Sequence, residues 1–198
     1  ANPLEGQMWY NNTTGNLKGR VLADSWASGT VLGTGRNTYL GGSRNGTQSA
    51  SRTAGGYTTV NVANNESYNG ASWTEEANIT TARRGAFGAG TDGAAIIMGG
   101  TSPLPGSITE EWNGSSWAEQ TDMTTPRNDV GSCGTQTATL VVGAPPYATT
   151  VEEYNGLSWT AGTALNTGMV NNPCCGVQTA ALSIGGQTAG GPTATTIV

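Results

Sequence analysis

The chain has 198 residues, 31 of them glycine, and only 11% of its residues are charged. Its 13 carboxylates outnumber its 8 basic residues, Lys18 is the only lysine, and histidine is absent. This composition argues against a helical protein and against nucleic-acid binding, which needs clustered cations. No apolar run approaches the roughly 20 residues of a membrane-spanning helix, so membrane insertion is not expected. Short strands and tight turns are expected instead.

The first 22 residues differ from the rest of the chain. Two strand-like runs, Glu5–Tyr10 and Asn16–Leu22, flank the polar turn Asn11–Gly15, which predicts an N-terminal β-hairpin. At the other end, the repeated pattern described next stops at Val198, partway through a strand. The hairpin therefore either completes the last sheet and closes a four-bladed ring, or links the chain to another module of a longer protein.

Residues 23–198 contain four copies of one pattern, spaced by 47, 44 and 42 residues. The copies are anchored on four tryptophans, Trp26, Trp73, Trp117 and Trp159. Ten residues after each tryptophan stand Arg36, Arg83, Arg127 and Met169. A glycine pair or its equivalent follows in every copy, at Gly55-Gly56, Gly99-Gly100, Gly143-Ala144 and Gly185-Gly186. A period in the forties is typical of repeat architectures.

The second copy shows what one repeat contains. Four short strands are predicted at Ser72–Glu76, Arg83–Gly90, Ala94–Met98 and Ser107–Trp112. A four-stranded antiparallel unit of this size must stack on its neighbours, and radial stacking gives an all-β propeller of about four blades. We expect the strand rich in glycine and alanine nearest the axis, and the tryptophan packed between adjacent sheets.

The three cysteines leave two interpretations open. Cys133 and Cys175 stand sixteen residues after their tryptophans and so share a column, and Cys174 adjoins Cys175. They are either small buried residues or partners in a disulfide between adjacent repeats. No zinc site is expected, because there is no histidine and no fourth thiol.

Catalytic side chains are not recognisable. The pairs Glu75-Glu76, Glu110-Glu111 and Glu152-Glu153 point to opposite faces of a strand, so a pair cannot flank one glycosidic bond. Nucleophilic catalysis lacks a histidine base and a Gly-x-Ser-x-Gly turn. We therefore expect no catalytic residue, no metal and no cofactor, and a protein that is not an enzyme.

Two sets of residues are candidates for ligand binding. The column Arg36, Arg83 and Arg127 either holds a carboxylated or sulfated glycan, or hydrogen-bonds neighbouring carbonyls or a glutamate of the next blade. Met169 in the fourth copy favours the second role. The loops after the glycine pairs differ most between copies, and they supply Thr101, Tyr147 and Gln187.

Several columns match a known kind of repeat together. The segments Thr150–Thr160 and Gly134–Ala138 resemble the kelch-like repeats of bacteriophage virion proteins, over roughly residues 23–198. The segment Asn2–Asn11, with Thr14–Lys18 after it, resembles a hairpin that introduces distal modules of phage tail fibres. The copper chemistry of galactose-oxidase-like kelch proteins cannot be carried over, because the chain has no histidine.

The resemblance implies a virion surface protein, outside the cell, with other virion proteins and host cell-surface polysaccharide as partners. It favours a tail fibre or receptor-binding component that attaches to host glycan, in a homo-oligomer or symmetric assembly. One alternative is a purely structural capsid-decoration or fibre-spacer protein. Another is a secreted bacterial lectin-like propeller.

Overall fold

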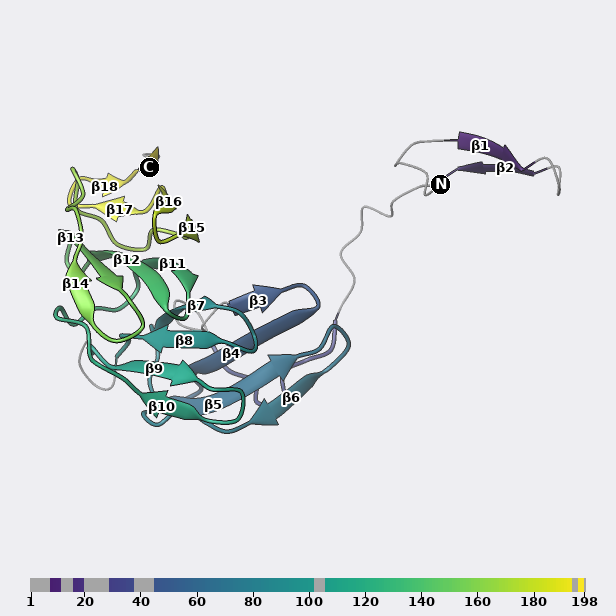
Figure 1. Cartoon of the computed structure of the whole chain (residues 1–198), viewed down its shortest axis with the longest axis horizontal. Helices are drawn as coiled ribbons and strands as arrows, with labels where there is room; N and C mark the ends of the chain where they lie inside the picture. The colour runs from purple at the N-terminus through teal and green to yellow at the C-terminus, as the bar shows by residue number, and fades with distance from the viewer. Residues whose placement is uncertain are drawn as a thin grey trace.

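The structure is a computed structural model that describes residues 8–11, 16–19, 29–37, 45–101, 106–193 and 196–197. This part of the chain consists of strands and turns (Figure 1), so the expected all-β class is confirmed. None of these residues belongs to a helix that is long and apolar enough to cross a membrane.

Four antiparallel sheets follow one another along an arc (Figure 1). Within each sheet the strands pair in chain order, as in the blades of a propeller. The first sheet contains β3 (Asn45–Thr47), β4 (Ala50–Tyr57), β5 (Asn61–Tyr68) and β6 (Trp73–Glu76). The second contains β7 (Phe87–Gly90), β8 (Ala95–Met98), β9 (Thr109–Trp112) and β10 (Trp117–Glu119). The third contains β11 (Gly131–Thr135), β12 (Ala138–Ala144), β13 (Ala148–Tyr154) and β14 (Trp159–Ala161).

The fourth sheet has three strands among the described residues, β15 (Cys174–Val177), β16 (Ala180–Ile184) and β19 (Thr196–Ile197). A small separate ribbon, β17 (Gln187–Thr188) with β18 (Gly191–Pro192), follows β16. The N-terminal hairpin pairs β1 (Met8–Asn11) with β2 (Asn16–Gly19). The hairpin contributes no described strand to any of the four sheets.

The first strands of the sheets are the ones that approach each other most closely along the arc. Strand β7 contacts both β3 and β11, and β11 contacts β15. Small residues permit this approach, since a Cβ on Gly131 of β11 would lie 2.3 Å from the Asn172 carbonyl oxygen. The strand rich in glycine and alanine, Phe87–Gly90, therefore lies where the sheets crowd together.

Apolar side chains fill the space between consecutive sheets. Trp117 packs with Trp112 and Ile97 of its own sheet against Ala54 and Ile79 from the side of the first sheet. The equivalent Trp159 packs against Phe87 and Met98 of the second sheet. Its indole Nε1 donates 3.1 Å hydrogen bonds to Thr109 Oγ1 and to the Thr121 carbonyl. Trp159 thus contributes both apolar surface and hydrogen bonds to the contact between sheets. Trp73 is half-buried, and Trp26 lies outside the described residues.

Each described tryptophan of the repeated column lies beside the aromatic residue that ends the preceding strand. The ring centroids are 5.0 Å apart for Tyr68–Trp73, 5.6 Å for Trp112–Trp117 and 4.9 Å for Tyr154–Trp159. An Asn-Gly turn sets this pairing. In the third sheet Asn155 Oδ1 accepts hydrogen bonds from the Leu157 and Ser158 amides, and Gly156 has a φ of 90°.

The glycine pairs pack closely against the backbone of the next repeat and donate hydrogen bonds to it. The Gly100 amide donates a 3.0 Å hydrogen bond to the Arg127 carbonyl, and the Gly56 amide donates a 2.9 Å bond to that of Arg83. A Cβ on Gly99, whose φ is 58°, would lie 2.4 Å from the same Arg127 oxygen. The glycine column and the arginine column thus share one period because they touch each other across consecutive sheets.

The cysteines are free thiols. Cys133 is buried, and Cys174 packs against its cluster from the fourth sheet. Cys175, which shares the column of Cys133, is exposed. Successive residues of a strand face opposite sides, so only Cys174 is directed back toward the third sheet.

Candidate functional site

The arginines of the repeated column lie inside the sheets and do not form a surface ring. Ion pairs join Arg36 to Glu66 at 2.6 Å, Arg83 to Glu110 at 2.5 Å, and Arg127 to Glu152. These six side chains are at most 2% exposed. The guanidinium groups also donate to backbone carbonyls, as Arg127 does to Gly143 at 2.7 Å. The column is thus closed to a glycan, and its contacts with carbonyls and a glutamate are structural. The glutamate lies in the sheet that the arginine's own crossover enters, and not in the blade after it as predicted.

Each glutamate also holds the crossover, the segment that leads from one sheet into the next. Glu152 accepts hydrogen bonds from the Thr124 amide at 2.8 Å, the Thr124 hydroxyl at 2.8 Å and the Thr125 amide at 3.1 Å. Burial alone would raise the pKa of Glu152, but these bonds and the positive charge of Arg127 hold that pKa below its ordinary value. Glu152 is therefore ionised, and it fixes the crossover to the third sheet.

The fourth copy changes both members of the pair. Met169 stands in the arginine column and is fully buried. In the strand ladder Val141 pairs with Glu152, and Ser183, which stands 42 residues after Val141, pairs with Ile197. Ile197 therefore occupies the register position of the glutamate. An ion pair in three copies corresponds to two apolar residues in the fourth.

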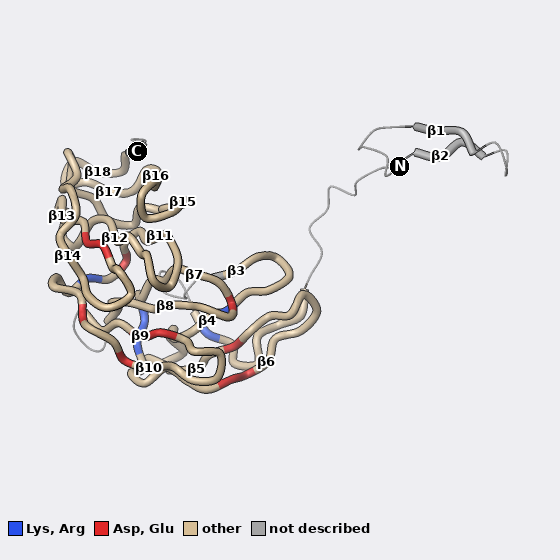
Figure 2. Tube along the Cα trace, in the orientation of Figure 1, with Lys and Arg blue, Asp and Glu red and all other residues tan. Residues whose placement is uncertain are grey.

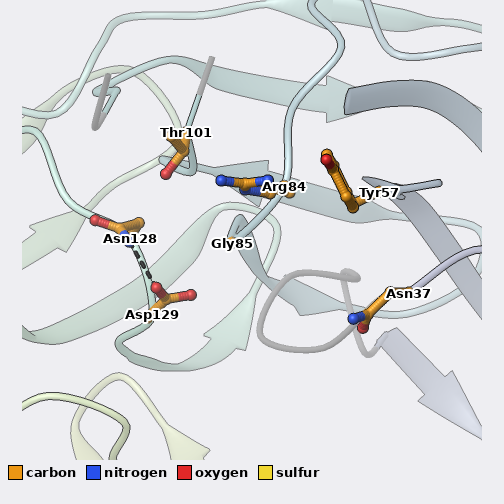
Figure 3. Close-up of a pocket in the computed structure, with 7 residues that line it drawn as sticks. All are labelled: Asn37, Tyr57, Arg84, Gly85, Thr101, Asn128 and Asp129. Carbon is orange, nitrogen blue, oxygen red and sulfur yellow. Dashed lines mark hydrogen bonds between the residues drawn. The ribbon is translucent and has the colours of Figure 1, made fainter. Parts of the chain in front are cut away.

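A pocket of about 310 Å³ lies where three consecutive crossovers meet the ends of the second strands. Figure 3 shows the side chains that surround this crossover pocket, with Arg84 between Thr101 and Tyr57. The pocket is lined by Asn37, Tyr57, Arg84, Gly85, Thr101, Asn128 and Asp129. Two short backbone bridges, Asn37 with Tyr57 and Arg84 with Thr101, hold the lining segments together.

The lining combines a cation, a carboxylate and an aromatic face. The Arg84 guanidinium lies 4.6 Å from the centroid of the Tyr57 ring, within cation–π range. Asn128 Nδ2 donates a 2.6 Å hydrogen bond to Asp129 Oδ2 (Figure 3). Burial raises the pKa of Asp129, while this bond and the charge of Arg84 oppose the rise. The pocket offers both donors and acceptors around a flat apolar surface, which suits a hydroxyl-rich ligand.

The backbone at Asp129 is held in an unusual conformation. Asp129 has a φ of 57°, in the left-handed region that aspartate and asparagine tolerate best among residues with a side chain. Its amide donates to the Gly85 carbonyl at 3.2 Å, and its own carbonyl accepts from the Asn171 amide at 2.8 Å. Asn171 repeats the left-handed conformation one copy later, with a φ of 55°. This chain of bonds connects the second, third and fourth crossovers and fixes the floor of the pocket.

The residues that the sequence proposed for ligand binding do not lie together in the structure. Thr101 lines the crossover pocket. Gln187 forms with Val170 the bridge that Thr101 forms with Arg84, so it lies at the equivalent position of the fourth copy. Its Nε2 donates a 3.3 Å hydrogen bond to the Tyr147 hydroxyl, outside the pocket lining. The three arginines of the column are not part of the lining.

Sequence reasoning missed the residues directly after the arginine column, Asn37, Arg84 and Asn128. A signal was available, since this position holds Asn, Arg, Asn and Val in the four copies whereas its neighbour is arginine in three of them. The described arginines are also scattered along the sheets rather than gathered into one basic patch (Figure 2). Among the residues described, no group of three or more histidine, cysteine, aspartate or glutamate side chains could hold a metal ion.

Comparison with solved structures supports the propeller-like fold. A protein described as "Structure of YjhT" matches with a TM-score of 0.57 and 14% identity, over 67% of this chain and 48% of that one. The chain thus spans about half the length of that protein. No protein-family model matches the sequence. No curated protein matches it either. At 14% identity the likeness extends to the fold alone: an all-β arrangement of four-stranded, propeller-like sheets.

Proposed function

We propose that this chain is a non-enzymatic phage surface protein that binds a saccharide of the host surface in the crossover pocket. The single observation that carries the binding function is the pocket lining. Tyr57 and Arg84 offer a stacked surface, and Asp129 and Asn128 offer hydrogen-bonding groups beside it. Sugars combine an apolar ring face with hydroxyl groups, which is the complement of such a lining.

The charged residues of the pocket indicate which class of saccharide would bind there. Arg84 is exposed, and it is the one lining residue with a permanent positive charge. A guanidinium binds a carboxylate through two parallel hydrogen bonds, so it favours a sugar that carries a carboxyl group. Asp129 would then accept hydrogen bonds from the hydroxyl groups. The described lining residues include one carboxylate, whereas glycoside hydrolysis by the usual mechanism needs two, which supports binding without turnover.

The phage setting rests on the resemblance of the repeats and of the N-terminal hairpin to virion proteins. The composition is compatible with this setting: the net charge is −5, and an acidic, lysine-poor chain does not favour nucleic acid. A structural role in the particle is the second candidate. It is favoured by the exposed Ile184 on the outer face of the fourth sheet, where the inner sheets bury the equivalent residue.

A glycan array probed with the purified chain tests the proposal, followed by titration of the best ligand. We expect binding of a carboxylated saccharide, weakened roughly tenfold or more by Arg84→Ala or Tyr57→Ala, because a hydrogen bond to a charged group contributes about 1.5–3 kcal/mol. Asp129→Asn keeps the left-handed backbone and is the mildest variant of the pocket. Glu119→Ala, an exposed change outside the lining, is the control. Binding that survives all three pocket variants would exclude this site, and release of cleaved sugar would contradict the non-enzymatic role.

A further inference from the structure

The outer face of the fourth sheet exposes apolar residues whose counterparts are buried one repeat earlier. In the third sheet Cys133, Leu140 and Val142 are at most 9% exposed, because the fourth sheet covers them. The residues 42 positions later are Cys175, Leu182 and Ile184. Cys175 is exposed, Leu182 is half-buried and Ile184 is 44% exposed. The fourth sheet therefore exposes the face that, in an inner sheet, packs against the next sheet.

The first sheet presents the opposite surface. In the third sheet Tyr154 and Trp159 are at most 6% exposed, and in the second Trp112 and Trp117 are equally buried. These aromatic pairs face the preceding sheet in each case. Their counterparts in the first sheet, Tyr68 and Trp73, are only half-buried, with their rings 5.0 Å apart. At this end of the arc, the aromatic surface that an inner sheet turns toward its predecessor is partly open.

Because the sheets repeat one pattern, the exposed face of the fourth sheet is complementary to the exposed face of the first sheet. In two internal contacts, apolar residues of one sheet pack against the aromatic pair of the next: Met98 and Phe87 pack with Trp159, and Ala54 packs with Trp112 and Trp117. Among the described residues, the contact between the third and fourth sheets contains no such aromatic pair. The fourth sheet carries the same kind of aliphatic face.

We propose that the outer face of the fourth sheet binds the first sheet of a second copy of this chain, in a head-to-tail contact. The occupant is a second copy because the complementary surface, Tyr68 with Trp73, is present on the chain itself. The contact continues the interface that the chain already forms between its own sheets. Such a contact uses a different surface on each of its two sides, and not one self-complementary patch. Two copies that form this contact at both of their ends make a closed ring. The proposal does not depend on what the crossover pocket binds.

The test is the mass of the full chain in solution, measured by light scattering after size exclusion over a range of micromolar concentrations. We expect a dimer, and at least a tenfold weaker association for Ile184→Glu, because a carboxylate would be buried against the Trp73 face. Leu157→Glu is the matched control, since Leu157 is 80% exposed in the turn between β13 and β14. It should associate like the parent chain.

Circular dichroism and the melting temperature establish that each variant is folded. If Ile184→Glu fails to fold, Cys175→Arg tests the same face at an exposed position. A parent chain that remains monomeric at every concentration would overturn the proposal. A dimer that Ile184→Glu and Cys175→Arg leave intact would overturn it as well.

Discussion

The Arg127 guanidinium donates to the Glu152 carboxylate inside the third sheet, where neither side chain is more than 2% exposed. Losing one partner of such a pair leaves an uncompensated buried charge, which typically costs about 3–5 kcal/mol. We expect Arg127→Met to lower the free energy of unfolding by this amount. Denaturant titration of the purified chain measures it.

The double variant Arg127→Met with Glu152→Ile copies the fourth repeat, where Met169 and Ile197 hold these positions. It should recover about half of the loss, because no charge is left without a partner while the Thr124 and Thr125 amides still lose their acceptor. The contrary outcome is a double variant that loses as much free energy of unfolding as the two single variants together. That result would show that Arg127 and Glu152 do not stabilise the fold through their interaction with each other.

Stability should fall in acid. The pKa values of Glu66 and Glu152 are lowered in the folded chain, since hydrogen bonds and the paired arginine outweigh the effect of burial. A lowered pKa gives stability that is present above the unfolded value of about 4.3 and is lost as the pH falls through the folded value.

We therefore expect an unfolding free energy that changes little from pH 8 to about 5 and decreases below about 4. Urea titrations at several pH values measure this profile. The raised pKa values of Glu111 and Asp129 act in the opposite sense and gain stability on acidification. Glu152→Gln isolates the effect, because it should flatten the acid decrease. An unchanged slope in this variant would contradict the assignment.

Trp117→Ala should destabilise the chain far more than Glu119→Ala. Trp117 is 6% exposed between the first two sheets, whereas Glu119 in the same strand is exposed. Removing a buried tryptophan typically costs about 3–5 kcal/mol, and an exposed substitution stays within about 0.5 kcal/mol. Thermal melts compare the two. Similar melting temperatures for both variants would refute the role of the tryptophan between sheets.

A cross-link between sheets should form at Cys133 and Cys174 rather than at Cys133 and Cys175. Cys174 hydrogen-bonds Cys133, which lowers the pKa of the Cys174 thiol and raises that of Cys133, and Cys175 is exposed on the other side. With oxidised glutathione as the oxidant, the Cys174 thiolate is expected to attack first and the Cys133 thiol to displace glutathione from it. Peptide mass mapping identifies the product. Cys175→Ser should leave the cross-link intact, and Cys174→Ser should abolish it.

Much of the fold is predictable from the sequence because the repeats impose it. The columns indicated four-stranded units, and the apolar run Ala95–Met98 is buried on both faces, as expected of a covered strand. The predicted grouping of strands was wrong in one respect. The tryptophan strand, predicted as the first strand of a unit, is the last strand of its sheet, as Trp73–Glu76 is in the first. The pocket was harder to predict. Arg83 and Arg84 are adjacent and chemically identical, and only the three-dimensional structure shows that Arg83 is buried while Arg84 is exposed. Periodicity points to residues that repeat for packing, whereas the pocket position after the arginine column holds Asn, Arg, Asn and Val.

The pairing of cysteines shows the same limit. A shared column placed Cys133 with Cys175, but equivalent residues of consecutive sheets face the same way and do not face each other. The neighbour across the contact is Cys174, in the column of Ser132, whose hydroxyl likewise bonds back to the Gly88 carbonyl of the preceding sheet. Contact between repeats joins different columns, and a sequence alignment of the copies does not reveal which ones.

One peptide bond separates the residue that anchors each crossover from the residue that lines the pocket: Arg36 from Asn37, Arg83 from Arg84, and Arg127 from Asn128. The anchor is enclosed and paired, so its neighbour is held in place whatever side chain it carries. Under the proposed binding function, changes at positions 37, 84 and 128 would therefore alter the ligand preference with little loss of folding. A library randomised at these three codons would turn the chain into a scaffold for selecting binders.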